Sequence, residues 1–280
     1  MSAVHNVNLS GEIRHALNQA VKGIERSAMF AVLGERLGAL PPDVTLPAGE
    51  VTMRLGPHLS GEVSPDQDAL LAEMGPEFPT YCSRYAILAM ITSCEEYLQR
   101  LLLIGRLAAL AAQQQRLTTA EQFHEARESC RKEVRRTSVD GLVPEILSSV
   151  GKECETVVGL EWFRGVYSIK RCLTHRGGRI GPDDVDGQET LDVVWRRFVL
   201  EVDGDEVVRF PYKVKEGQLV PIGFTDESRS WRLGEAINLT AQECQHVGLS
   251  LSIFCKELAD LLQRALLDLF GVQAREPSNT

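Results

Sequence analysis

Apolar residues recur at helical spacing through most of the first 175 positions of the chain. Over residues 9–37 they stand three to five positions apart, which places them on one face of an amphipathic helix. These residues are Ile13, Leu17, Val21, Ile24, Met29, Val32 and Leu37. From Thr80 to about Gln115 the chain has no proline and its apolar positions cover nearly the whole helix circumference. We expect one long, centrally placed helix there, with a kink at Gly105.

Prolines and glycines interrupt the helical pattern over residues 38–63. We expect a loop there, with one short strand at Glu50–Leu55. Ser64 then offers a helix N-cap, followed by a proline and by a capping-box glutamine at Gln67. This signal predicts a short helix to about Met74.

Three further helices are predicted before residue 180. A capping box over Thr118–Glu121 opens a highly charged helix that runs to about Arg136. A brief helix is expected at Val143–Val150. The next helix covers Glu153–His175 and ends at Gly177–Gly178, a glycine pair typical of helix C-termini.

The pattern changes to strands over residues 190–235. Apolar segments on either side of Asp203–Asp205 predict a β-hairpin. Lys213–Val220 is expected to form a second hairpin and Trp231–Ile237 a further strand. A capping box at Thr240 then opens a last helix that continues to Gly271.

The fold class predicted from these elements is mainly α: a helical bundle with a small antiparallel β-meander inserted before the C-terminal helix. The expected division is an N-terminal helix and loop (1–63), a helical core (64–185), the β insert (186–239), the C-terminal helix (240–271) and a loose tail (272–280).

Composition is that of an ordinary soluble globular protein, with 44% apolar and 25% charged residues in 280. No apolar stretch approaches the roughly 20 residues of a membrane span. The net charge of −9 argues against a general nucleic-acid coat protein. The seven cysteines are odd in number and lie mostly in apolar helical patterns, and no signal peptide is evident. We therefore expect a cytoplasmic protein with reduced thiols.

One stretch, Trp162–Pro182, carries five cations and no acid. The cations are Arg164, Lys170, Arg171, Arg176 and Arg179. Helical spacing gives this stretch an apolar stripe and a polar stripe. The polar stripe comprises Glu161, Arg164, Ser168, Arg171 and His175. Arg171 and His175 are thus expected on one face, one turn apart, beside a glycine-rich turn.

An arginine beside a histidine suits phosphoryl chemistry on RNA. Histidine can act as general acid or base near neutral pH, while a guanidinium stabilises charge on the phosphate. The alternative is a plain basic helix end that meets the negative end of the helix dipole. A Cys172–His175 nucleophile pair lacks an orienting third group, and we expect Cys172 to be packed in the core. No nucleotide-binding loop, zinc signature or hydrolase motif is present, so no cofactor or metal is predicted.

The run Ile169–Gly178 resembles the signature of HEPN-domain proteins, which are α-helical bundles carrying R-x4–6-H followed by a glycine-containing turn. Ser93–Leu98 is similar to the acidic helix that packs beside that motif. The resemblance covers about residues 80–180 and implies a metal-independent endoribonuclease of toxin–antitoxin or phage-defence systems, active as a homodimer. A neutralising or regulatory protein is a further implied partner.

The resemblance implies roles for individual residues. His175 would be the acid/base and Arg171 the phosphate stabiliser, although three residues separate them and the family's spacing of four falls on Lys170. Glu95 could orient His175 or an arginine, or belong to a solvated helix patch. Further RNA contacts are expected from three cations: Arg164, Arg176 and Arg179. Because some HEPN domains are non-catalytic, the alternative function is an RNA-binding, protein-interaction or dimerisation module.

Overall fold

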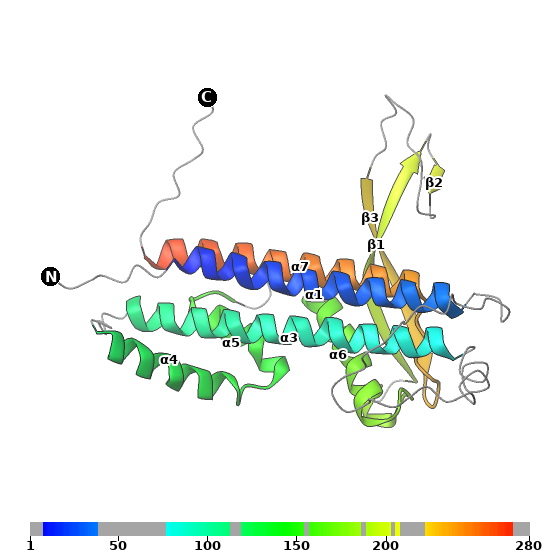
Figure 1. Ribbon diagram of the computed structural model, residues 1–280, viewed down its shortest axis with the longest axis horizontal. Coiled ribbons are helices and arrows are strands. Elements are labelled where there is room, and N and C mark those ends of the chain that lie inside the picture. Colours follow the sequence, from blue (N-terminus) through cyan, green and yellow to red (C-terminus); the bar gives the residue numbers. More distant parts are fainter. Residues whose placement is uncertain are drawn as a thin grey trace, which may run out of the picture.

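Three long helices form the body of the molecule: α1 (Leu9–Gly38), α3 (Phe78–Ala112) and α7 (Ala241–Leu269). They lie side by side, with α1 antiparallel to the other two (Figure 1). The computed structural model describes residues 8–38, 77–112, 119–153, 157–185, 189–202, 205–207 and 222–270. The predicted mainly helical fold with a small antiparallel sheet before the C-terminal helix is confirmed.

Small residues on α1 set its distance from α3. Its buried face consists of Ile13, Ala16, Ala20, Ile24, Ala28, Ala31 and Gly34. A Cβ added at Gly34 would lie 2.3 Å from the Cβ of Cys82, and one added at Gly23 would lie 2.4 Å from the Oγ of Ser93. The helices therefore approach more closely than larger residues would permit, and α1 belongs to the same hydrophobic core as α3 and α7.

Two shorter helices pack near the C-terminal half of α3. Helix α4 (Ala120–Val134) has its capping box at Thr119 and Gln122, so the predicted box at Thr118–Glu121 is wrong by one residue. Helix α5 (Val139–Ser149) begins four residues before the predicted start. Its Ser149 lies against α3, where a Cβ at Gly105 would meet the Ser149 Oγ at 2.3 Å. Gly105 therefore admits a neighbouring helix, and α3 continues through it (Figure 1).

The sheet has the order β2-β1-β3 and is antiparallel. Its strands are β1 (Thr190–Val202), β2 (Asp205–Val207) and β3 (Ile222–Arg232). The β1–β2 pair confirms the predicted hairpin, with Val202 opposite Asp205. The predicted strand Trp231–Ile237 is wrong in its bounds, because β3 ends at Arg232 and begins at Ile222. The sheet packs on α6 and α7 through β1 side chains that include Val193 and Trp195.

A polar cluster fastens the sheet to α7. The Glu227 carboxylate accepts hydrogen bonds from Trp195 Nε1 at 2.9 Å and from His246 Nδ1 at 3.0 Å. Burial alone would raise the pKa of Glu227, but these two donors and the neighbouring positive charges outweigh it and lower that pKa. His246 on α7 thus has a structural partner on β3.

Several sequence predictions lie outside the described residues. They are the strand at Glu50–Leu55, the helix from Ser64 to Met74, the hairpin at Lys213–Val220 and the tail at 272–280. None of the helices in the described part of the chain combines the length and apolar character of a membrane span. Every cysteine in that part is buried and reduced, as the sequence predicted.

Candidate functional site

Helix α6 (Leu160–His175) carries the cationic run. It begins later than the predicted Glu153 because Gly159, with φ of 83°, adopts a left-handed conformation directly before it. The predicted glycine C-terminus is confirmed, with φ of 59° at Gly177 and 82° at Gly178. Phe163, Val166 and Ile169 face the core as the spacing predicted, and Cys172 is packed there as expected.

The outer face of α6 presents Arg164, Arg171 and His175 to solvent. Within the described residues, none of these three side chains makes a hydrogen bond or an ion pair. An α-helix turns about 100° per residue, so Arg171 and His175 point within about 40° of each other. Lys170 points about 140° away from His175. The pair that shares a face is therefore Arg171 and His175.

Lys170 is held on the side of α6 that faces α3. Its ammonium group forms an ion pair with Glu95, and both side chains are largely buried. The Lys170 Nζ also lies 5.7 Å from the centroid of the Tyr167 ring. Glu95 therefore pairs with the lysine, and the predicted contact of Glu95 with His175 or an arginine is not formed.

Arg176 follows the helix and pairs with two acids that the sequence pattern does not identify as its partners. These are Asp183, at 2.6 Å, and Asp184, both in the short 3₁₀ helix η2 (Pro182–Asp184). The Asp184 side chain is 1% exposed and the Asp183 side chain 77%. Burial alone would raise the pKa of Asp184, but hydrogen bonds from the Gly181 N–H, Cys172 and Arg176, with the Arg176 charge, lower it. Arg176 thus stabilises the turn rather than standing free beside His175.

The turn after α6 is anchored to residues 233–237. Ile237 N–H donates to the Gly178 carbonyl at 2.7 Å, and Gly234 N–H donates to the Ile180 carbonyl at 2.9 Å. Arg179 is exposed in this turn, and its guanidinium donates to the Gly234 carbonyl at 3.2 Å. The backbone beside His175 is therefore fixed, while a Cβ at Gly177 would meet nothing within 4 Å.

Cys172 is excluded as a nucleophile. Its side chain is buried, and burial together with the hydrogen bond to Asp184 raises its pKa to about 12. A thiol with that pKa stays protonated at neutral pH and is a weak nucleophile. In the described part of the chain, no group of three or more metal-binding side chains gathers.

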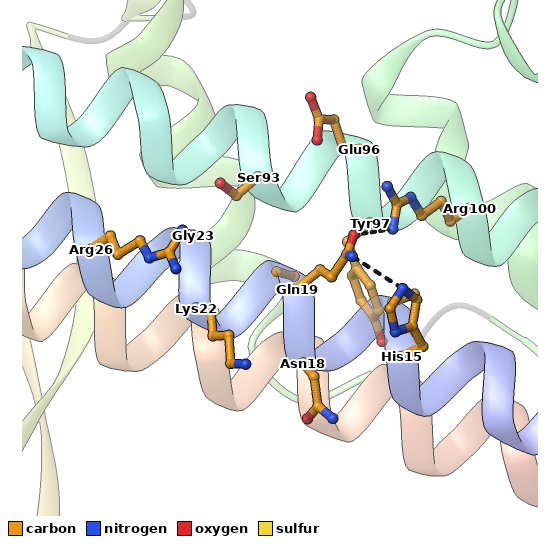
Figure 2. A pocket seen from close by; sticks show the side chains of 12 residues that line it. His15, Asn18, Gln19, Lys22, Gly23, Arg26, Ser93, Glu96, Tyr97 and Arg100 are labelled. Atoms are coloured by element: carbon orange, nitrogen blue, oxygen red, sulfur yellow. Dashed lines mark hydrogen bonds between the residues drawn. The ribbon is translucent and has the colours of Figure 1, made fainter.

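A second polar surface lies between α1 and α3 (Figure 2), and no residue of α6 lines it. It is a cavity of about 520 Å³ whose lining includes His15, Lys22, Arg26, Glu96 and Arg100. His175 does not line it. No local pattern in the sequence predicts this cavity, because the α1 residues that line it precede those of α3 by more than sixty positions and meet them only when the two helices pack together.

The seven predicted site residues thus separate into groups. Arg164, Arg171 and His175 share one exposed face, while Arg179 is exposed in the following turn. The others, Lys170 with Glu95 and Arg176 with its two aspartates, form ion pairs. Comparison with known proteins finds no matching family model, no matching curated protein and no matching solved structure.

Proposed function

We propose that the protein is a HEPN-like, metal-independent endoribonuclease, with His175 as acid/base and Arg171 stabilising the phosphate. The observation that carries this proposal is the outer face of α6, where Arg171 and His175 lie together, exposed and without side-chain partners among the described residues. A histidine and an unoccupied guanidinium are the groups that RNA transesterification needs.

The reaction needs both a base and an acid. The base removes the proton of the RNA 2′-hydroxyl, whose oxygen attacks the adjacent phosphorus. The bond to the 5′-oxygen breaks, and the acid protonates that leaving oxygen, which yields a 2′,3′-cyclic phosphate and a 5′-hydroxyl. One imidazole cannot hold both protonation states at once. His175 from a second copy of the chain would supply the other role, so the proposal includes a homodimer.

Arg171 would contact the phosphate under attack. Its guanidinium offers a fork of donors that matches two phosphate oxygens, and it keeps its charge throughout the reaction. Arg164 lies two helical turns, about 10 Å, along the same face and would hold a flanking phosphate. In a toxin or defence role we expect the protein to act in the cytoplasm, with a second protein restraining it.

The test is cleavage of a defined single-stranded RNA by the purified protein in EDTA. Wild-type protein is expected to leave cyclic-phosphate ends, and His175→Ala to slow cleavage by about 100-fold or more. His124→Ala is the matched control, because His124 is an exposed histidine on α4. Equal cleavage by wild type and His175→Ala would overturn the assignment of His175.

The second candidate is a non-catalytic module that binds RNA or a protein partner. The ion pair of Lys170 with Glu95 favours it, because the position that matches the family's spacing is occupied by a cation already neutralised. A folded, dimeric wild-type protein that binds RNA without cleaving it, and binds it less well as Arg171→Ala, would establish this module in place of the nuclease.

A further inference from the structure

The cavity between α1 and α3 is lined by cations that have no acidic partners. They are Lys22 and Arg26 on α1 and Arg100 on α3, and within the described residues none has a carboxylate at ion-pair distance. Glu96 is the one acid among the residues that line the cavity. The lining therefore carries three positive charges and one negative charge in a protein whose net charge is −9. Such a local excess of positive charge attracts an anion.

Two hydrogen bonds link Arg100, Gln19 and His15 in the cavity, and in each the donor can be identified. An Arg100 N–H donates to the Gln19 side-chain oxygen at 2.5 Å, and because arginine can only donate, this contact fixes the orientation of the Gln19 amide. The Gln19 nitrogen then donates to His15 Nε2 at 3.0 Å, which places the imidazole proton on Nδ1. Each of the three side chains retains at least one N–H group that these two contacts do not use.

The floor of the cavity is formed by buried residues of α1 and α3. Tyr97 is buried beneath it and donates its hydroxyl to the Cys255 carbonyl on α7 at 2.7 Å. Ala16, Ala20 and Gly23 face it from α1, so small side chains leave the space open. Arg26 and Arg100 stand toward opposite ends of this stretch (Figure 2). A ligand lying between the helices would thus meet a guanidinium at each end.

We propose that this cavity binds a small phosphorylated molecule. Phosphate supplies several acceptor oxygens with negative charge, which complements a lining of N–H donors and cations. The volume of about 520 Å³ is in the range of small-molecule sites. This site is separate from the α6 face and does not depend on the ribonuclease proposal.

Calorimetric titration of the purified full chain with inorganic pyrophosphate tests the site. Arg26→Gln combined with Arg100→Gln is expected to weaken binding at least tenfold, since each substitution removes a charged donor. The matched control is Arg264→Gln, which changes an exposed arginine on α7 and is expected to leave pyrophosphate binding unchanged. Arg171→Gln is also expected to leave it unchanged, and that result would show that pyrophosphate does not bind at the α6 face. Binding that these cavity substitutions leave unchanged, or no binding by wild type, would overturn the proposal.

A third substitution tests whether the ligand is an anion, through the direction in which it changes the binding affinity. Glu96→Gln removes the acid of the lining and is expected to strengthen pyrophosphate binding several-fold. Weaker binding in Glu96→Gln would mean that the carboxylate contacts the ligand directly, which contradicts an anion site. Citrate, an anion without phosphorus, is expected to bind less tightly, and equal affinity would overturn the assignment to phosphate. Circular dichroism confirms that each variant is folded.

Discussion

Arg171 and Arg176 belong to the same cationic run, yet they lie in opposite surroundings. Arg171 projects from the outer face of α6 with no side-chain partner among the described residues, whereas Arg176 is bound by two aspartates of the following 3₁₀ helix. The two arginines are alike in sequence. What separates them is whether the fold brings a carboxylate to each, so a count of positive charge overstates the number of cations available to a ligand.

The α6 face and the α1–α3 cavity differ in a second way. Both carry cations without acidic partners among the described residues, but the α6 face is the outer side of one helix, while the cavity lies between two helices and is open to solvent. A single helix surface cannot surround a substrate or exclude water. The proposed ribonuclease would therefore need a second chain to form a cleft at the α6 face, whereas every residue that lines the cavity belongs to one chain.

Asp184→Asn gives the largest expected effect on stability. It is expected to lower the free energy of unfolding by about 2 kcal/mol, because it weakens the hydrogen bonds that hold the turn after α6. Asp183→Asn alters the exposed acid that pairs with the same arginine. This substitution is expected to change the free energy of unfolding by less than about 0.5 kcal/mol. Chemical denaturation measures both, and equal effects would show that Arg176 does not depend on the buried acid.

The contribution of Asp184 is expected to depend on pH. Because folding lowers the pKa of this carboxyl, its stabilisation is complete above the unfolded value of about 3.9 and is lost as the pH falls through the lower folded value. The gap in stability between wild type and Asp184→Asn should stay constant from about pH 7 to 5 and narrow below about pH 4. Thermal unfolding across this pH range measures the gap in stability. A gap that widens in acid would contradict the lowered pKa of Asp184 in the folded protein.

Lys170→Met and Arg171→Met should give opposite results. Lys170→Met leaves the largely buried Glu95 carboxylate without its ion-pair partner. It is expected to lower the free energy of unfolding by about 1 kcal/mol and to change RNA affinity little. Removing Arg171 is expected to weaken RNA binding about tenfold and leave stability unchanged. Denaturation and RNA titration on the two variants check this, and a stronger effect of Lys170 on RNA would shift the candidate site toward the family's spacing.

The smallest expected effect is a change in salt dependence. Arg164→Gln should reduce the slope of log affinity against log salt by about 0.7, the value for one phosphate contact on a single strand. Arg264→Gln on α7 should leave the slope unchanged. RNA titrations at several salt concentrations measure both slopes.

Features set by nearby residues were predictable from the sequence. The capping box of Thr240 and Glu243, the apolar stripe of α6 and the glycine turn after His175 all form as expected. Strand β3 was misplaced because it lies at the sheet edge with mostly exposed side chains and lacks an apolar alternation. Its backbone pairing with β1, and the contact of Glu227 with Trp195 and His246, hold it in place.

The mainly helical fold, the buried cysteines and the shared face of Arg171 and His175 follow from the sequence alone, because helical periodicity fixes which residues point in the same direction. Which cations are exposed without an acidic partner depends on how the elements pack in three dimensions. Lys170 and Arg176 meet their acids through the packing of α6 on α3 and the fold of the turn. Arg26 and Arg100 line one cavity because small residues let α1 lie against α3. Charge pairing depends on distance in space, which a linear pattern does not contain.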